Sequence, residues 1–465
     1  MSGLPVGVPT APAILAARLA GGLSRRLGRG GGTSLPGKLL LKLRPEAVGE
    51  MGAALPHGST LVSATNGKTT TTRLIASCAR ATGWPMVSNP AGANLLSGVA
   101  TALLDARGRR PRPTGGLFEV DEGALPEVAR QLRPHVVLLM NLFRDQLDRY
   151  GELETLAARW ETMVAGLPPG ARAVVNADDP TIASLAEAAP DALTFGVDDP
   201  EVALAALPHA ADSTRCRRCS APLRYDRVTI AHLGSWWCPS CGARRPEPDV
   251  RVTRVEVRGV RGMAITIATP AGPIQADLPL FGLHNAYNAC AAAAAALAMG
   301  MTTDALARGL AASAAAFGRG ERLRVADRDL VLLLAKNPTG VNENIRTVLL
   351  DPEPLHLLIA LNDRTADGRD VSWIWDVDYE PMLGRAEALT LTGDRAHDMA
   401  LRMRYAGVPD ADMRVIPDAA AALDAALAST PAGATLYVLP TYTAMLGLRA
   451  TLVDRGVAED FWRER

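Results

Sequence analysis

One loop combines the residue types that bind a polyphosphate. It follows a short apolar strand, Thr60–Val62, and opens a helical stretch, Thr69–Ala81, with the sequence Ser63-Ala64-Thr65-Asn66-Gly67-Lys68-Thr69-Thr70. A loop in this position directs backbone N–H groups and the positive end of a helix dipole toward an anion. Lys68 would reach the β- and γ-phosphates of a nucleotide, and the Thr69 hydroxyl would bind Mg²⁺. Val62 replaces a glycine of the full Walker pattern, but the strand–loop–helix context favours phosphate binding over a chance Gly-Lys-Thr.

Four of the six cysteines form two pairs with metal-ligand spacing. Cys216 and Cys219 make the first pair, and Cys238 and Cys241 follow after eighteen intervening residues. Two such pairs supply four thiolates to a tetrahedral Zn²⁺, which leaves no open coordination position and predicts a structural site. The alternatives are unliganded thiols, paired disulfides or a ribbon that binds nucleic acid.

Acidic residues follow the next predicted strand. Glu119, Asp121 and Glu122 lie at the end of Gly116–Val120. Ligands gather at the C-terminal ends of strands in an open α/β sheet, so a carboxylate there could hold the Mg²⁺ of an ATP site. The polar run 141–148 follows a further strand in the same way. Taken alone, each group is better explained by capping or by solvated charge.

Composition limits the class of protein. The chain has 465 residues, 48% of them hydrophobic, and its 49 Lys+Arg balance 49 Asp+Glu. That length suffices for about three domains, and zero net charge gives no electrostatic argument for bulk nucleic-acid binding. No apolar run reaches the roughly 18 residues that span a bilayer, and the N-terminal apolar stretch precedes its arginines, the reverse of a signal peptide. These features predict a soluble cytoplasmic protein in which Cys78 and Cys290 are buried packing residues.

The order of predicted elements gives an α/β fold of two units. Strands and helices alternate from residue 60, which predicts a parallel sheet covered on both faces. A hairpin, 250–257 and 263–267, precedes an Ala-rich helix, and a second alternation begins after Arg324. The predicted divisions are an N-terminal segment, a central ATP-binding domain with the cysteine insert, and a smaller C-terminal α/β domain, at 1–45, 46–324 (insert 212–246) and 325–465.

In this order the motifs resemble those of the Mur ligase superfamily. The matching segments are Thr-Asn-Gly-Lys-Thr-Thr at 65–70, the carboxylate strand, the 141–148 run, His284-Asn285-x2-Asn288, Gly318-Arg319 and Ala335-Lys336-Asn337-Pro338. More narrowly, the chain resembles the MurT branch, the ligase subunits of lipid II isoglutaminyl synthases. That resemblance depends on Glu119-Val-Asp-Glu-Gly, the cysteine insert and the segment 361–376, LNDRTADGRDVSWIWD.

The resemblance implies a Mur-type central P-loop ATPase domain and a Rossmann-like C-terminal domain. It implies ATP-dependent amidation of the α-carboxyl of D-glutamate in the lipid II stem peptide to D-isoglutamine, through an acyl phosphate, for peptidoglycan biosynthesis. A GatD-type glutamine amidotransferase subunit would supply ammonia at the inner face of the cell membrane. The basic segment 35–44 could touch that membrane, although a plain surface helix explains it more simply.

The same resemblance assigns roles to individual residues. Lys68, together with Mg²⁺ held by Thr69 and Glu119, would offset the charge of the transferring phosphoryl group. The other nucleotide contacts would come from the loop, the base site, the γ-phosphate site and the second domain, namely Thr65, Asn66, Gly67, Thr70, Asn288, Arg319, Lys336 and Asn337. Asp370 would complete the glutaminase triad across the subunit interface, whereas the residues alone indicate a loop cap.

Two positions depart from the family pattern. Ala64 replaces a glycine that usually precedes Thr-Asn-Gly-Lys, which costs stability only if the position needs a positive φ. Gln146 replaces a histidine of the amino-acid-adding Mur ligases, as it does in the MurT branch. The alternative function is a stand-alone Mur or folylpolyglutamate-type ligase that joins an amino acid, but that function leaves the cysteine insert unexplained. A zinc-ribbon scaffold with a merely structural nucleotide site is an alternative of another class.

Overall fold

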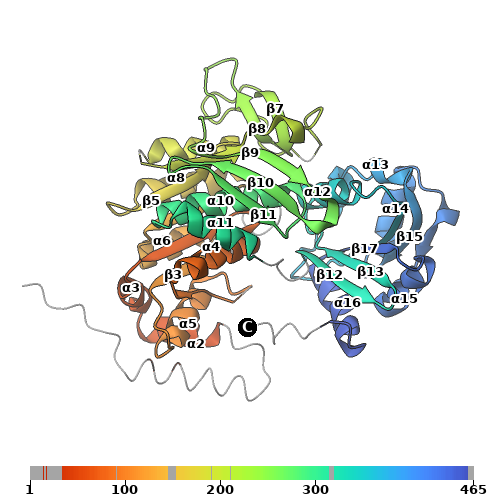
Figure 1. The fold of residues 1–465 in the computed structure, drawn as a ribbon, viewed down its shortest axis with the longest axis horizontal. Helices are drawn as coiled ribbons and strands as arrows, with labels where there is room; N and C mark the ends of the chain where they lie inside the picture. Colours follow the sequence, from red (N-terminus) through yellow and green to blue (C-terminus); the bar gives the residue numbers. More distant parts are fainter. Residues whose placement is uncertain are drawn as a thin grey trace, which may run out of the picture.

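Two lobes, each built on its own β-sheet, make up the protein (Figure 1). The computed structural model describes residues 34–458 apart from 91, 145–152, 190, 210 and 314–318, together with Ile14 and Ala17. Within that part, a nine-stranded sheet has the order β11-β10-β9-β6-β5-β4-β1-β3-β2, and a six-stranded sheet has the order β12-β13-β17-β14-β15-β16. A separate hairpin, β7-β8, belongs to the cysteine insert.

The first lobe joins a parallel sheet to an antiparallel edge. Strands β2 to β6 and β9 run parallel with β1, and β10 and β11 extend the sheet antiparallel. Its strands are β1 (Ser59–Ser63), β2 (Met86–Val87), β3 (Gly115–Glu119), β4 (Val136–Leu139), β5 (Arg172–Asn176), β6 (Leu193–Val197), β9 (Val250–Val257), β10 (Met263–Ala268) and β11 (Ile274–Leu278). Every residue of β1 and β4 is buried, as expected for parallel strands covered on both faces. The predicted parallel sheet and the 250–267 hairpin are therefore confirmed.

Helices cover both faces of this sheet. One face packs against α4 (Lys68–Thr82), α10 (Leu283–Ala298) and α11 (Thr303–Ala311). The other face packs against α2 (Leu35–Leu43), α3 (Ala47–Ala53), α5 (Leu96–Ala106), α6 (Leu125–Leu132), α8 (Leu153–Ala165) and α9 (Pro180–Ser184). The basic segment forms α2, which lies on α5 with Lys38 and Lys42 exposed. Among the described residues, no helix is long and apolar enough to cross a bilayer.

The second lobe has a parallel sheet with one antiparallel edge strand. Its strands are β12 (Arg319–Val325), β13 (Arg328–Leu333), β14 (Leu355–Ala360), β15 (Ala386–Thr392), β16 (Met413–Val415) and β17 (Thr435–Pro440), and its helices are α12 (Pro338–Val348), the 3₁₀ turn η4 (Ser372–Asp376), α13 (Glu380–Leu383), α14 (Ala396–Tyr405), α15 (Ala419–Ser429) and α16 (Tyr442–Asp454). The predicted division after Arg324 would cut β12, which pairs with β13. We therefore propose a division before Arg319.

Candidate active site

The loop between β1 and α4, residues 64–67, is shaped by one glycine. Gly67 has a φ of +91°, and a Cβ on it would lie 2.2 Å from the Asn288 Oδ1. Only glycine avoids both the strained φ and this contact. Ala64 does not have a positive φ and is fully buried, so alanine is tolerated at the position where the family usually has glycine.

Asn141, which follows the end of the neighbouring strand β4, holds the same loop. Its Oδ1 accepts from the Asn66 N–H at 2.9 Å, and its Nδ2 donates to the Asn66 carbonyl at 3.0 Å. The Phe143 N–H donates to the Thr65 hydroxyl at 3.0 Å. The sequence marked the run 141–148 as polar but gave Asn141 no role, because a reciprocal amide contact leaves no spacing signal. Residues 145–148, including Gln146, lie outside the described part.

Lys68 is a buried cation at the start of α4. Its ammonium donates to the Glu122 carboxylate at 2.9 Å and also to the Ala64 carbonyl. The side chains of Lys68 and Glu122 are 11% and 10% exposed, so each charge depends on the other for compensation. The sequence placed Glu122 near a metal but did not predict its pairing with Lys68.

Thr69 and Glu119 meet beside Lys68. The Thr69 hydroxyl lies 3.0 Å from Oε1 and 2.9 Å from Oε2 of Glu119. Asn89 fixes the backbone of Glu119 by accepting from its N–H at 3.0 Å and donating to its carbonyl at 2.8 Å. A hydroxyl and a carboxylate are the oxygen ligands that Mg²⁺ takes beside substrate phosphates, so this donor set fits the ion.

A cleft opens from the loop toward the second lobe. Its empty volume, including the part open to solvent, is about 920 Å³, which suits a nucleotide. The lining mixes apolar and polar side chains from both lobes. The first lobe contributes Asn66, Gly67, Thr70, Asn141, Phe143, Ile230, Leu233, Phe281, His284, Tyr287 and Asn288, and the second contributes Gly320, Leu333, Leu334, Lys336, Thr339, Gly340, Glu343 and Asn344. Burial raises the pKa of Glu343, a cleft residue that the sequence did not predict.

Two residues of the second lobe reach the loop directly. The Lys336 ammonium donates to the Thr65 carbonyl at 3.0 Å. The Asn337 and Asn66 side-chain amides exchange hydrogen bonds of 3.0 and 3.3 Å. Asn337 also caps α12, because its Oδ1 accepts from the Gly340 N–H at 2.9 Å. The lobes are thus joined beside the cleft.

The two remaining predicted residues, Arg319 and Asp370, also belong to the second lobe. Arg319 begins β12, and its side chain lies outside the described part. Asp370 is exposed on the loop between β14 and η4, where its Oδ1 accepts from the Ser372 N–H at 2.8 Å. That hydrogen bond lowers the pKa of Asp370 and keeps the carboxylate charged. The contact is the loop cap that the residues alone indicated.

The four cysteines of the insert converge around β7 (Arg224–Ile230) and β8 (Leu233–Trp237). Their sulfurs all lie within 4.8 Å of one another, a spacing that accommodates a tetrahedral Zn²⁺ with bonds of about 2.3 Å. Backbone N–H groups, first that of Cys241, lower the pKa of Cys238 to about 6 and favour its thiolate. The donor set therefore fits Zn²⁺.

The other two cysteines are packing residues, as predicted. Cys78 and Cys290 are fully buried. Burial raises the pKa of each thiol to about 12, so neither forms a reactive thiolate near neutral pH.

The class of protein follows from the fold and from comparisons with known proteins. A sequence model described as the Mur ligase middle domain matches residues 62–236. The structure of a pseudomurein peptide ligase type C from Methanothermus fervidus is similar, with a TM-score of 0.68 and 19% identity over 90% of this chain and 83% of that one. The structure of a folylpolyglutamate synthase from Mycobacterium tuberculosis is also similar, with a TM-score of 0.62 and 17% identity over 96% of this chain and 100% of that one. Both lobes thus share the Mur ligase fold.

Sequence comparison narrows the class. A model described as the MurT ligase C-terminal domain matches residues 334–445. The chain is 31% identical to the lipid II isoglutaminyl synthase (glutamine-hydrolyzing) subunit MurT of Streptococcus pneumoniae, over 97% of this chain and 99% of that protein. It is 30% identical to the subunit of the same name from Staphylococcus aureus strain N315, over 85% of this chain and 88% of that protein. The chain belongs to the MurT family.

Proposed function

We propose that the chain is the ligase subunit of a lipid II isoglutaminyl synthase. It amidates the α-carboxyl of D-glutamate in the lipid II stem peptide to D-isoglutamine, with ammonia released from glutamine by a GatD-type partner. The similarity to the pneumococcal MurT subunit, which extends over 97% of the chain, carries the proposal. A stand-alone amino-acid ligase is less supported, because the folylpolyglutamate synthase is similar in fold at only 17% identity.

The ATP chemistry would take place at the phosphate loop. A carboxylate is a poor acyl donor, so one of its oxygens attacks the γ-phosphorus of ATP, ADP leaves, and an acyl phosphate forms. Lys68 would move from Glu122 to the β- and γ-phosphates and offset their developing charge. Thr69 and Glu119 would hold Mg²⁺, which neutralises further phosphate charge when bound.

The second lobe would close the site. Lys336 and Asn337 already contact the loop, so they would hold the lobes together over bound nucleotide. Arg319 would approach the γ-phosphate, and Asn288 would approach the base. Closure would exclude water, which otherwise hydrolyses the acyl phosphate.

Nitrogen would arrive from the partner subunit. Ammonia attacks the acyl carbon, phosphate leaves, and the nitrogen loses a proton. Ammonium has no lone pair for this attack, so delivery from a docked glutaminase avoids the protonated pool near neutral pH. Asp370 would orient the catalytic histidine of that glutaminase and stabilise its cationic form, and the complex would act at the inner face of the membrane.

The decisive experiment follows the mass of a D-glutamate-containing lipid II. The full chain is incubated with the substrate and ATP, either with glutamine and the glutaminase partner or with ammonium alone. We expect a loss of about one mass unit in both reactions, because an amino group replaces a hydroxyl. No mass change with either nitrogen source, together with ATP hydrolysis stimulated by an amino acid, would instead indicate the stand-alone ligase.

A further inference from the structure

The cysteine insert forms part of the wall of the nucleotide cleft. Ile230 at the end of β7 and Leu233 at the start of β8 both line it. Between the cleft and the insert lies Tyr287, next to Asn288 on α10 and itself a lining residue. An insert that the sequence predicted to be structural therefore touches the candidate site.

Tyr287 is held by hydrogen bonds from two directions. Its hydroxyl donates to the Asp178 Oδ2 at 2.5 Å and shares a hydrogen bond with the hydroxyl of Thr229 on β7. Tyr287 is 5% exposed, and Thr229 is fully buried. A buried aromatic ring whose hydroxyl makes two hydrogen bonds has one preferred position. These two partners therefore fix the cleft wall beside Asn288.

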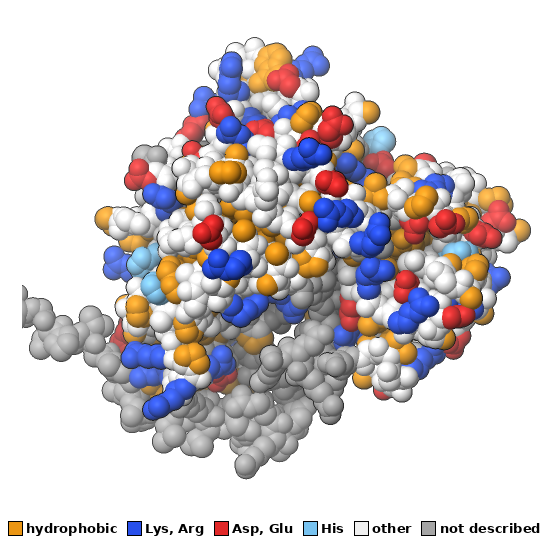
Figure 2. All heavy atoms as spheres, viewed as in Figure 1, with side chains coloured by type: hydrophobic (Ala, Val, Ile, Leu, Met, Phe, Trp, Pro, Cys, Tyr) orange, Lys and Arg blue, Asp and Glu red, His pale blue; other side chains and the backbone are white. Residues whose placement is uncertain are grey.

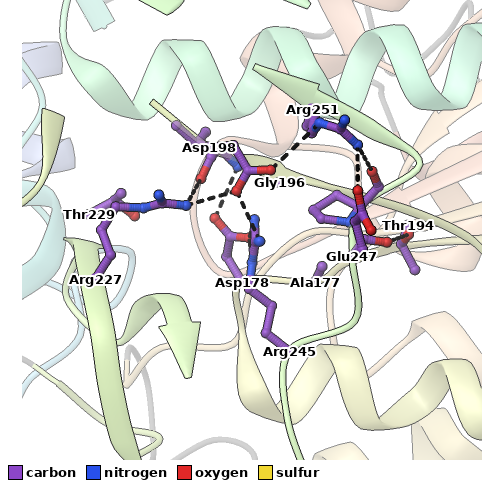
Figure 3. Close-up of polar contacts among 12 residues, drawn as sticks. Ala177, Asp178, Thr194, Gly196, Asp198, Arg227, Thr229, Arg245, Glu247 and Arg251 are labelled. Atoms are coloured by element: carbon purple, nitrogen blue, oxygen red, sulfur yellow. Dashed lines mark hydrogen bonds and ion pairs between the residues drawn. The ribbon is translucent and has the colours of Figure 1, made fainter. Parts of the chain in front are cut away.

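An arginine of the insert compensates the charge of Asp178. The Arg245 Nη2 lies 2.7 Å from the Asp178 Oδ1, and its Nη1 lies 2.9 Å from Asp198. Figure 3 shows Arg227, Arg245 and Arg251 converging on Asp178 and Asp198. Burial raises the pKa of Asp178, and Arg245 is the strongest opposing influence.

Thr229 also connects the insert to the second lobe. Arg346 on α12 donates to the Thr229 carbonyl at 2.8 Å and to the Val202 carbonyl at 3.3 Å. The same guanidinium contacts Glu343, a lining residue of the cleft, at 3.2 Å. Thr229 is thus a common contact of the insert, α10 and α12.

We propose that the cysteine insert sets the geometry of the nucleotide cleft, with Thr229 and Arg245 as positioning residues that act through Tyr287. The proposal rests on the proposed function for the identity of the ligand, MgATP. Positioning raises nucleotide affinity without contact between these two residues and the phosphates. Metal binding by the four cysteines and nucleotide binding in the cleft are then coupled, and such coupling is reciprocal.

Equilibrium binding of a fluorescent ATP analogue to the full chain, without lipid II, tests the positioning role. Thr229→Val is expected to raise the Kd about three- to tenfold, and Arg245→Met tenfold or more, since the latter removes a charged hydrogen bond. Matched controls are Thr253→Val at an exposed position of β9 and Arg224→Met at the exposed start of β7, and both should bind as the wild type does. Zinc content is measured for every variant.

Wild-type affinity in zinc-loaded Thr229→Val and Arg245→Met would overturn the positioning role of these two residues. A loss of affinity only in proportion to lost zinc would overturn that role as well, because the variants would then act through the metal and not through Tyr287. If Arg245→Met does not fold, Thr229→Val and Tyr287→Phe decide the question, because each removes little more than a hydroxyl. Failure of the wild type to bind MgATP would contradict the proposed function instead.

Reciprocal coupling gives a second test with zinc as the readout. Saturating MgATP should increase the chelator concentration that removes half of the zinc from the wild type, about threefold or more. The shift should be absent in Tyr287→Phe. An equal chelator midpoint with and without nucleotide in the wild type would overturn the coupling.

Discussion

The phosphate loop and the Asp370 loop differ in how completely the chain builds them. In the phosphate loop, the charge of Lys68 is balanced by Glu122, and both side chains are largely buried. The Thr69 hydroxyl donates to Glu119, and the Asn66 backbone N–H donates to Asn141. Asp370 is exposed, and the partner that the described residues give its carboxylate is Ser372, close by on the same loop. The difference is consistent with the proposed function, in which this chain carries the ATP site and a partner subunit supplies the nitrogen.

The most general loss, because it extends to both nitrogen sources, should come from removing the buried Lys68 ammonium. Lys68→Ala should reduce amidation about a thousandfold or more with glutamine or with ammonium, because both need the acyl phosphate. Lys42→Ala on the exposed face of α2 is the control. Since the substitution leaves Glu122 buried without a cation, Lys68→Ala/Glu122→Gln tests whether the loss is chemical. Ammonium-driven amidation close to the wild-type rate would show that the ATP site lies elsewhere.

Asp370→Asn should separate the two regions. Glutamine-driven amidation should fall by about four orders of magnitude, because an amide cannot stabilise the imidazolium of a triad. Ammonium-driven amidation should stay unchanged. The exposed Asp412 offers the control Asp412→Asn on the same lobe. Loss of both activities in folded Asp370→Asn would remove the interface role.

Loss of a contact between the lobes is expected to have an intermediate effect on catalysis. Lys336→Ala removes the hydrogen bond to the Thr65 carbonyl and should raise the ATP KM about tenfold. ATP hydrolysis without amidation should also rise, because water reaches the acyl phosphate. Steady-state kinetics in which ADP and amide are measured in the same reaction check the ATP KM and the uncoupled hydrolysis. Lys38→Ala is the control. An unchanged ratio of ADP to amide would contradict the shielding role.

The smallest effect concerns a contact between the lobes outside the cleft. His209 lies 2.8 Å from the Asp378 Oδ1, and that hydrogen bond raises the pKa of His209. Because the folded pKa is raised, the contact is fully present below the unfolded value of about 6.5 and is lost as pH rises through the folded value. His209 is 87% exposed, so the ATP KM should rise less than about twofold across that window. Kinetics of wild type and His209→Asn over that range check this, and the variant should lack the change.

Local motifs could be predicted, whereas contacts between distant segments could not. The strand–loop–helix at Lys68 follows from adjacent residues, as do the buried cysteines. Asn66 and Asn337 are separated by 271 positions, and nothing in the sequence pairs two asparagines at that distance. The strand β12 was not predicted, because its residues, Arg-Gly-Glu-Arg-Leu-Arg-Val, show no apolar alternation. The role of Asp370 came from the family resemblance alone and remains a prediction.

Surface charge was predictable only as a total. Figure 2 shows acidic and basic side chains interspersed over both lobes, in keeping with the zero net charge. The pairs that matter, such as Arg245 with Asp178, are buried within the fold. Their partners depend on how β5, β6 and the insert come together, which composition does not encode.

The alanine-rich helix α10 has a practical consequence for measuring closure. Its residues Ala289 to Ala296 are fully buried and lie against strands on one side and α4 on another. Methyl groups at that spacing leave no room for the helix to slide, and larger side chains would not fit. Displacement during a catalytic cycle is therefore expected at α12 rather than at α10. A spectroscopic label on α12, referenced to one on α11, would report lobe movement against a fixed frame.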